Sequence, residues 1–407
     1  MNRMRLYSLS FLTLCFLTFG LMISCADESS ELMDMVDTDS GDTDDDSDGT
    51  ETDPLAGLDL PATYFNYANQ AVPGYINEDN TGTNTITDEV ATLGRVLFYD
   101  TNLSENNTIS CASCHQQSHG FSDPAVQSVG KEGGLTGRHS MRLINSGFAE
   151  EVHFFWDERA TSLENQTTQP IRDHIEMGFS GEDGDPSFAD LLTRMEALAY
   201  YPTLFLDAFG TAAITEDRMQ LALAQFVRSI QSFDSKFDEG LAAVGMNNLN
   251  QDFPNFTAQE NEGKRLFLTP PPNGGVGCAG CHRAPEFDID PDSRNNGVIG
   301  LAGGGAGIDL TNTRSPSLRD LIGPGGNSNG PFMHDGSLTT LLEVINHYNL
   351  IADNNQNTNL DPRLNPPGPG SQNLNLTDQQ KEALVAFLET LTGTDVYTNE
   401  KWSNPFD

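Results

Sequence analysis

The 407-residue sequence predicts a mainly α-helical protein with two similar domains and long ordered loops, after an N-terminal export signal and a disordered acidic tether. Apolar residues recur every three or four positions in several segments, whereas the alternating pattern of strands is scarce. A short sequence also occurs twice, as G-R-V-L-F at 94–98 and as G-K-R-L-F at 263–267. Each copy precedes a pair of cysteines. We therefore expect two copies of one module, in residues 56–250 and 251–407.

Residues 1–25 have the pattern of a bacterial lipoprotein-type signal peptide. Arg3 and Arg5 precede an apolar run, and Cys25 follows as the residue to which lipid would be attached. The alternative is an uncleaved membrane helix, but the run is short for crossing a bilayer and contains Ser, Thr and Gly. Both interpretations place the rest of the chain outside the cytoplasm. We expect an exported protein of the periplasm or cell envelope, held to the membrane only by its lipid.

Residues 26–55 predict a disordered acidic linker, because Asp, Glu, Ser, Thr and Gly dominate and little apolar surface can be buried. The whole chain has a net charge of −38, and residues 56–407 keep 46 acidic against 19 basic side chains. Such a charge repels nucleic acids and anionic lipid surfaces, so neither is an expected partner. The negative charge could serve to attract a basic protein partner or only to keep the protein soluble, and both explanations stay open.

Two helices have clear start signals. Thr215 is an N-cap followed by two acids, and an apolar stripe continues through Met219, Leu223, Phe226, Ile230, Phe233 and Phe237. Thr377 opens a second helix with a capping box to Gln380. We expect that helix to bury Leu384, Phe387, Leu388 and Leu391 and to end at Gly393.

Two stretches rich in Gly, Pro and Asn, residues 295–308 and 323–331, predict ordered loops around the functional sites. The glycines at 303–305 lack the strand, turn and helix of a phosphate-binding loop. We therefore expect no nucleotide site there.

The cysteine pairs read C-A-S-C-H at 111–115 and C-A-G-C-H at 278–282. C-x-x-C-H is the signature of covalent c-type haem attachment. On a helix, the two cysteines share one face and reach both vinyl groups, while the histidine points at the iron. A zinc site and a thioredoxin-like redox pair are the alternatives, but neither explains a histidine in the same place twice. We expect two covalent haems, bound by Cys111, Cys114 and His115 and by Cys278, Cys281 and His282.

At this point the chain resembles the bacterial di-haem cytochrome c peroxidases and their MauG-type relatives, from Leu93 to about Tyr348. The resemblance implies two cytochrome c-like haem domains. The motifs that carry it occur in the family's order: L-G-R-V-L-F-Y-D at 93–100, T-I-S-C-A-S-C-H at 108–115, F-F-W-D-E-R at 154–159, S-L-E-N-Q at 162–166, I-E-M at 175–177, P-S-L-R at 316–319 and M-H-D-G at 333–336.

The resemblance implies three catalytic residues at the first haem. The family's catalytic glutamate falls on Glu176, its glutamine on Gln166 and the tryptophan between the haems on Trp156. Peroxide cleavage needs a base that moves a proton between the two oxygens, and Glu176 is the candidate, with Gln166 orienting peroxide or water. The alternatives are an exposed acid at a helix start for Glu176 and a core aromatic for Trp156.

Many of these peroxidases have a second histidine that blocks the resting first haem, sixteen residues after the C-x-x-C-H histidine. That position is Lys131 here, so the chain departs from the family pattern. His119 starts on the wrong side of the porphyrin, and His139 is displaced in sequence. We therefore predict a first haem with an open distal side, as in the MauG branch.

For the second haem, the resemblance places the sixth iron ligand fourteen residues after His334, on Tyr348. Peroxidases of the better-known type have methionine there, whereas MauG-like enzymes have tyrosine. Tyr348 also continues an apolar stripe from Leu341 and Ile345. The neighbouring His347 stays open as an alternative because imidazole is the better ligand, and Met333 is a third candidate.

Two further expectations concern binding groups. Arg314 and Arg319 are candidates for pairing with haem propionates. The family also carries calcium between its domains, for which the backbone carbonyls near Asn329 and Pro331 are candidate ligands. The family's asparagine ligand falls near His139, which departs from that pattern.

The leading functional hypothesis is an exported peroxidase. Residues 56–250 would reduce hydrogen peroxide to water at the peroxidatic haem. Residues 251–407 would receive electrons from a small cytochrome c or a cupredoxin. One alternative is a MauG-like oxidase acting on a protein or small organic substrate. Another is a non-enzymatic electron carrier. A homodimer stays open.

Overall fold

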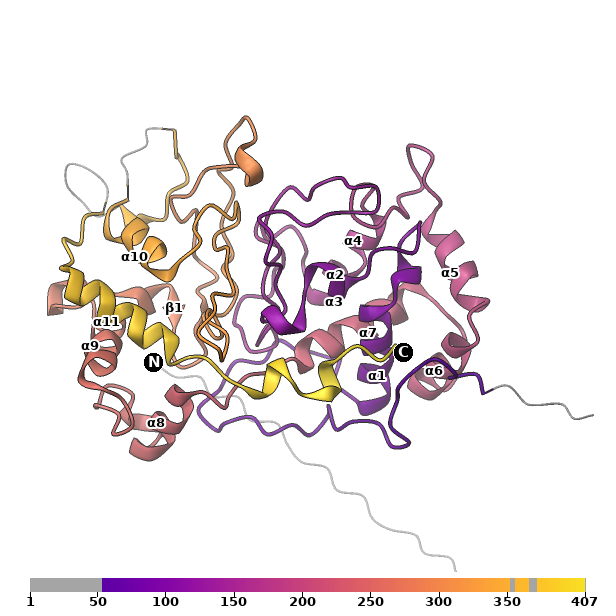
Figure 1. Cartoon of the computed structure of the whole chain (residues 1–407), viewed down its shortest axis with the longest axis horizontal. Coiled ribbons are helices and arrows are strands. Elements are labelled where there is room, and N and C mark those ends of the chain that lie inside the picture. The colour runs from indigo at the N-terminus through magenta and orange to yellow at the C-terminus, as the bar shows by residue number, and fades with distance from the viewer. Residues whose placement is uncertain (1–52, 352–355, 366–371, 407) are drawn as a thin grey trace, which may run out of the picture. The chain divides into compact units, whose positions relative to one another are not determined.

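A computed structural model describes residues 53–351, 356–365 and 372–406 of the chain (Figure 1). The expected signal peptide with Cys25, and nearly all of the acidic linker, lie outside the described residues. Among the helices of the described part, none combines the length and apolar character that a membrane crossing requires.

Helices dominate the described part of the chain, which confirms the predicted mainly α class. They are α1 (Asp88–Tyr99), α2 (Cys111–Cys114), α3 (Leu163–Thr167), α4 (Gln169–Arg172), α5 (Phe188–Glu196), α6 (Tyr200–Phe209), α7 (Glu216–Ser229), α8 (Lys236–Val244), α9 (Ala258–Leu268), α10 (Leu341–Asn349) and α11 (Asp378–Glu389). Two-residue strands β1 (His282–Arg283) and β2 (Asp288–Ile289) pair antiparallel, with His282 opposite Ile289.

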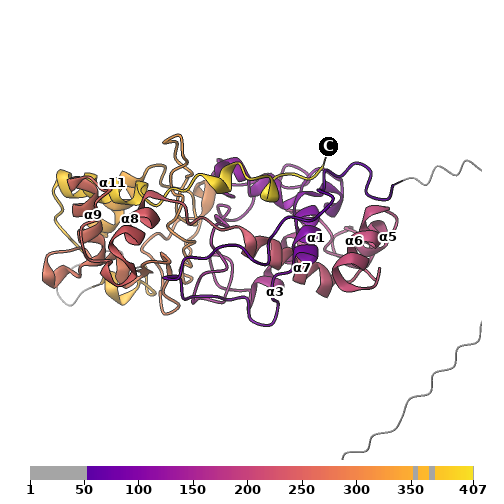
Figure 2. The same cartoon turned by 90° about the horizontal axis from the view of Figure 1, so that it is seen from below.

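The repeated sequence forms the same helix crossing twice. α1 packs on α7, and α9 packs on α11 (Figures 1 and 2). At the first crossing, Gly94 lies against the backbone of Ala222, and at the second, Gly263 lies against Ala383. A Cβ on either glycine would overlap the facing carbonyl oxygen, so only glycine permits this approach. The internal repeat therefore encodes one packing contact in two places.

An aromatic pair follows each crossing at the same offset. Phe98 packs on Phe226 with ring centroids 5.2 Å apart, and Phe267 packs on Phe387 at 5.3 Å. Phe98, Phe226 and Phe387 have no exposed surface or almost none. Each pair places a large apolar surface behind one cysteine cluster, so both modules begin from the same core.

Two hydrophobic cores divide the described chain near residue 233. The first is built from residues between 55 and 230 together with Val396 and Trp402, which the C-terminal segment returns to it. The second is built from residues between 237 and 391 and includes Phe237 and Leu241 of α8. Figure 2 shows the C-terminal segment leaving α11 and running toward α1. The cores thus separate before the expected boundary at residue 250.

The helix predicted from Thr215 begins as expected, but its extension to Phe237 is wrong. The Thr215 side chain accepts a hydrogen bond from the backbone of Arg218, and α7 then ends at Ser229. Beyond it, the side-chain amide of Asn145 binds both backbone groups of Ser232, at 2.8 and 3.1 Å. These contacts replace helical hydrogen bonds, and a new capping box at Ser235 starts α8.

The second predicted helix also starts correctly and ends early. Thr377 and Gln380 form the expected capping box of α11, but the helix stops at Glu389 instead of continuing to Gly393. Gly393 has a different purpose: a Cβ there would overlap side chains of Ser232 and Asp234. Its N–H donates to Asp320 Oδ1 at 2.9 Å. The glycine permits a close crossing of two segments, and it does not cap a helix.

Candidate active site

Each cysteine cluster lines its own cavity. A cavity of about 720 Å³ is lined by Cys111, Cys114 and His115. A second cavity of about 600 Å³ is lined by the other cluster, Cys278, Cys281 and His282. All four cysteines are free thiols. Both cavities fall within the usual size of cofactor sites.

The two clusters differ in local backbone. Cys111–Cys114 form the expected helical turn α2, which begins after Ser110. Cys278–Gly280 form a tighter 3-10 turn instead, after Gly277 in the left-handed region at φ 74°. The expected α-helical placement of cysteines is therefore correct for the first cluster only. The second histidine enters strand β1 directly.

The two histidines also differ in their second ring nitrogen. His115 Nδ1 lies 3.2 Å from the carbonyl oxygen of Phe121, a residue with a positive φ of 55°. Phe287 lies five residues after His282, one position closer than Phe121 is to His115, and has a similar positive φ of 61°. Nevertheless, His282 Nδ1 is buried and has no hydrogen-bond partner in the described part of the chain. Burial lowers the pKa of His282 to about 4.

Buried arginines provide a test of whether these cavities fit haem. Arg142 lines both cavities and Arg314 lines the first, and the Nε of each is buried without a partner among the described residues. A buried guanidinium N–H without a partner is costly and suits a carboxylate, which a porphyrin carries as its propionates. The residues present therefore fit haem. Arg319 does not: it forms a buried ion pair with Asp238 at 2.8 Å, so its expected pairing with a propionate is wrong.

The predicted catalytic residues meet in the first cavity. Gln166, from α3, and Glu176 both line it. The carboxyl side chain of Asp173 accepts hydrogen bonds from the backbone of Ile175 and of Glu176, at 2.8 and 3.0 Å. Burial, with a smaller contribution from Asp173, raises the pKa of Glu176 to about 7. Such a carboxyl group exchanges protons near neutral pH, as a catalytic base must.

The three candidates for blocking the first iron are all engaged elsewhere. Lys131 does not line the cavity; its ammonium group pairs with Glu105 and Asp185. His119 Nε2 bonds the carbonyl oxygen of Gly330 at 2.8 Å. His139 does line the cavity, but its Nδ1 lies 3.1 Å from the Ala125 carbonyl and its Nε2 3.4 Å from Ser122 Oγ. This arrangement favours the open first site that the sequence predicts.

Trp156 lines both cavities and is buried. It lies in a turn closed by the pairing of Phe154 with Ala160. Its Nε1–H donates to the carbonyl oxygen of His139 at 2.7 Å, and its own carbonyl accepts from the backbone of Arg314 at 2.8 Å. The indole is therefore fixed between the two sites.

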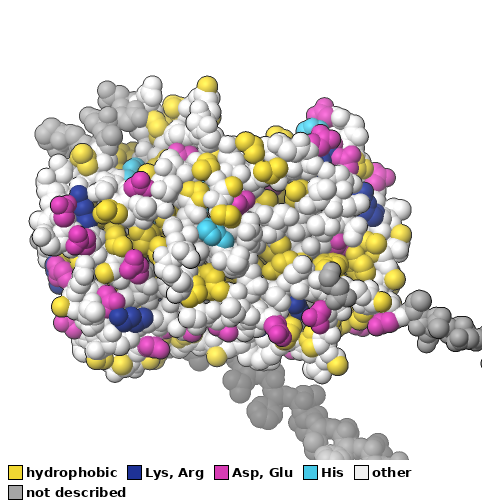
Figure 3. Space-filling model, in the orientation of Figure 1, with side chains coloured by type: hydrophobic (Ala, Val, Ile, Leu, Met, Phe, Trp, Pro, Cys, Tyr) yellow, Lys and Arg dark blue, Asp and Glu magenta, His cyan; other side chains and the backbone are white. Residues whose placement is uncertain are grey.

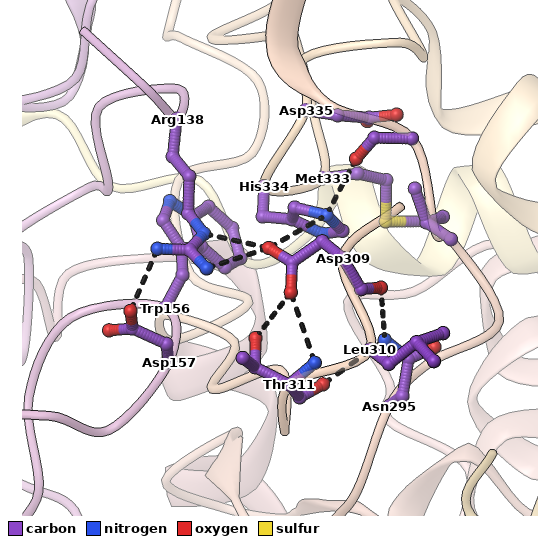
Figure 4. Close-up of polar contacts among 12 residues, drawn as sticks. Arg138, Trp156, Asp157, Asn295, Asp309, Leu310, Thr311, Met333, His334 and Asp335 are labelled. Carbon is purple, nitrogen blue, oxygen red and sulfur yellow. Dashed lines mark hydrogen bonds and ion pairs between the residues drawn. The ribbon is translucent and has the colours of Figure 1, made fainter. Parts of the chain in front are cut away.

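A polar network surrounds Trp156 (Figure 4). Arg138 bridges Asp157, at 2.8 Å, and Asp309, at 2.7 Å. His334, of the M-H-D-G motif, packs edge-on against Trp156 with ring centroids 6.3 Å apart. Its Nε2 lies 3.7 Å from Asp309 Oδ2. Burial lowers the pKa of His334. The network ties the two halves together around the tryptophan.

In the second cavity, Tyr348 and Met333 both line the wall together with His282. Tyr348 lies in the last turn of α10, and burial raises its pKa. His347 does not line this cavity; its Nε2 bonds the carbonyl oxygen of Asn296 at 2.9 Å. Of the two neighbours, Tyr348 is the one that the helix places on the side of the cysteine cluster.

The expected calcium ligands are near each other but carry other contacts. The Asn329 side-chain amide donates to Asp320 O at 2.9 Å and to Tyr397 Oη at 2.7 Å. Pro331 lines the second cavity. Within the described ranges, no group of three or more His, Cys, Asp and Glu could hold a metal. Calcium therefore stays a prediction.

Sequence reasoning missed two residues of the sites. Arg142 lines both cavities, yet in sequence it is an arginine without a motif. Asn296 contacts Met333, with Nδ2 at 3.4 Å from the sulfur, and its side chain is hydrogen-bonded to Tyr348. It falls in a stretch predicted only as a loop. Burial and contact identify both residues, and the local sequence contains no signal for either.

Comparisons with known proteins agree with this geometry. The family model for di-haem cytochrome c peroxidase matches residues 88–244. The methylamine utilization protein MauG of Methylophilus methylotrophus is 31% identical over 320 residues, covering 76% of this chain and 84% of that protein. The cytochrome c551 peroxidase of Nitrosomonas europaea is 29% identical, covering 75% and 80%.

Among solved structures, a MauG-like protein associated with microbial copper homeostasis matches with a TM-score of 0.65 and 28% identity, covering 83% of this chain and 99% of that one. The likeness therefore extends over both modules. This chain belongs to the di-haem cytochrome c peroxidase and MauG family.

Proposed function

We propose that the protein is an exported peroxidase that reduces hydrogen peroxide to water at the first site with electrons delivered through the second. The observation that carries the proposal is the placement of Glu176, with a pKa of about 7, on an otherwise unblocked wall of the first cavity. A carrier of electrons alone would have no need for such a group. Family membership supports a di-haem oxidoreductase of either the peroxidase or the MauG kind.

Haem, when bound, would supply redox-active iron at each site, and the two electrons that reduce one peroxide would come from the donor. The protein's own groups then move the proton. Glu176 would accept a proton from one oxygen of peroxide and return it to the other, while Gln166 would orient peroxide or water through its amide. Trp156, fixed between the cavities by its hydrogen bond to His139, is positioned to carry electrons between the sites.

The electron donor is a small cytochrome c or cupredoxin, in keeping with an exported location and a lipid anchor at Cys25. The acidic character of residues 56–407 favours a donor with a basic surface. Figure 3 shows acidic side chains mostly along the margins of the visible face, so on that face charge alone marks no single docking patch. Hydrogen peroxide is the oxidising substrate.

A steady-state assay tests this function. Purified protein carrying both haems is mixed with a reduced small cytochrome c or a reduced cupredoxin, and oxidation of the donor is followed after addition of peroxide. We expect peroxide-dependent oxidation that is lost in Glu176→Gln. Absence of oxidation with every donor tried would contradict the proposal.

A second candidate is a MauG-like oxidase that takes electrons from a protein residue or a small organic molecule. Tyr348 favours it, because a tyrosine on the second cavity wall replaces the methionine of better-known peroxidases. So does the 31% identity to a methylamine utilization protein. This candidate predicts that peroxide-treated protein oxidises an added organic or protein substrate faster than it oxidises reduced cytochrome c.

A further inference from the structure

Lys131 is a buried lysine that faces two carboxylates. Only 7% of the residue is exposed. Its ammonium group lies 2.6 Å from Asp185 Oδ1 and also pairs with Glu105. Burial alone would lower the pKa of Lys131, but hydrogen bonds to Asp185 and Glu105 outweigh burial and raise it. The lysine is therefore charged, and its ammonium group forms ion pairs with two carboxylates from different segments of the chain, Glu105 and Asp185.

The backbones of Lys131 and Glu105 both contact the loop that contains Glu176. The N–H of Lys131 donates to Glu176 O at 3.0 Å, and the N–H of Glu105 donates to Met177 O at 2.8 Å. The side chains of Lys131 and Glu105 then join each other. Two backbone hydrogen bonds thus hold adjacent carbonyl groups of the loop. Together with the Lys131–Glu105 ion pair they form a closed ring of contacts, here called the ion-pair ring.

Packing reinforces this ring on the far side of the loop. Gly178 adopts φ 83°, and a Cβ there would lie 2.5 to 2.6 Å from the side-chain atoms of Lys131. The lysine's methylene chain therefore lies directly on the loop backbone. Asp185, the second partner, also accepts from Ser180 Oγ at 2.7 Å, and His174 Nδ1 lies 2.9 Å from it. Residues on both sides of Glu176 are connected to one ammonium group.

We propose that Lys131 is a positioning residue that holds Glu176 at the first site through this ion-pair ring. The inference rests on the proposed role of Glu176 as the base. Removing the ammonium group would take the main cationic partner from the buried Asp185 carboxylate and leave it with Ser180 and His174. The loop would relax to solvate it, and Glu176 would move with the loop. A displacement of the order of 1 Å at a reacting group is enough to slow a reaction many-fold.

The test compares Lys131→Met with Lys264→Met in protein that carries both haems. Lys264 is a suitable control because it is equally buried, at 2% exposure, but it binds backbone carbonyls of the second module. Amide hydrogen exchange of residues 174–178 is measured along with the rate at which ferric protein reacts with peroxide. We expect faster exchange and a rate about tenfold lower in Lys131→Met alone. Wild-type exchange and rate in Lys131→Met would overturn the proposal.

A double-mutant cycle shows whether Lys131 acts through Glu176. In a Glu176→Gln background, Lys131→Met should change the peroxide rate little. A full tenfold loss in that background would overturn the proposal, because the lysine would then act by another route. If Glu176→Gln alone leaves the peroxide rate unchanged, the assignment of Glu176 as the base fails. If Glu176→Gln lowers the rate but Lys131→Met does not, only the positioning role of Lys131 fails.

A milder variant covers the case in which Lys131→Met does not fold. Asp185→Asn removes one of the two ion pairs of Lys131, leaves the pair with Glu105 in place and keeps the shape of the side chain. It should increase exchange in residues 174–178 and lower the peroxide rate in the same direction as Lys131→Met. An Asp185→Asn protein with wild-type exchange and a wild-type peroxide rate would count against the positioning role of Lys131.

Discussion

The two modules share one helix packing but differ in the residues that line their cavities. Gly94 and Gly263 make equivalent helix crossings, and the phenylalanine pairs behind the cysteines match within 0.1 Å. The walls facing the histidines differ. Glu176 and Gln166 line the first cavity, whereas Tyr348 lines the second together with its cysteine cluster.

The residues that differ between the two cavities come from outside the repeated helix pairs, from a loop in the case of Glu176 and from helices α3 and α10 in the case of Gln166 and Tyr348. Glu176 lies in a loop between α4 and α5, and Tyr348 lies near the end of α10, far from the repeated helices in sequence. The helix pairs pack in the same way behind each cysteine cluster, and the segments outside them supply the cavity residues that differ. Function therefore resides in the insertions more than in the repeat.

Glu176→Gln should produce the largest effect and should act on the first module only. Loss of a positioned proton-transfer group lowers the rate of reaction with peroxide by about 10² to 10⁴. Stopped-flow absorbance of the ferric protein after mixing with peroxide measures it. A rate within a factor of two of wild type would show that the two sites do not differ in the way described.

Tyr348→Met should act on the second module only. An anionic oxygen ligand favours ferric iron, whereas methionine raises the potential, and axial ligands set haem potentials over a range of about 0.8 V. We expect the second haem to shift upward by on the order of 100 mV and the first to stay unchanged. A spectroscopic redox titration resolves the two. No shift would mean that Tyr348 does not ligate iron.

Gly94→Ala and Gly263→Ala test the shared frame. Each adds a Cβ against a carbonyl oxygen at the helix crossing, so each should lower the free energy of unfolding by about 2 to 3 kcal/mol. Gly325→Ala is the control, since its nearest neighbour would be in ordinary contact at 3.5 Å. Chemical denaturation measures the three. If only one of the two crossing variants were destabilised, the modules would not share a packing contact.

The rate of reaction with peroxide should also depend on pH, because Glu176 lines the first cavity only. The pKa of Glu176 is raised to about 7, so its basic form is lost as the pH falls through that value. The rate of reaction with peroxide should fall about tenfold for each pH unit below 7. Glu176→Gln should flatten this profile, which the same stopped-flow measurement would show. A wild-type rate independent of pH between 5 and 7 would contradict the assignment.

The fold was predictable where the signal is local. Thr215 and Thr377 carry side-chain caps that start α7 and α11, and the two cysteine clusters need only five residues each. The glycine of the sequence repeat occupies the same kind of helix crossing in both places. These features depend on neighbours in sequence, so periodicity and capping rules find them.

The rest depends on partners far away in sequence. α7 stops where Asn145 binds Ser232, an interaction across 87 positions. The sequence shows that Lys131 replaces the family's histidine. It does not show that Lys131 pairs with Asp185, because that partner lies 54 positions further along the chain. The unpaired Nε of Arg142 likewise appears only once burial is known. Such contacts are set by tertiary packing, and no pattern in one sequence determines them.

The most direct test is an electron paramagnetic resonance spectrum of the ferric protein with both haems attached, recorded before and after addition of cyanide. The account predicts one high-spin signal from the first site that converts to low spin with cyanide, and one low-spin signal from the second that does not change. Two low-spin signals that both ignore cyanide would contradict it.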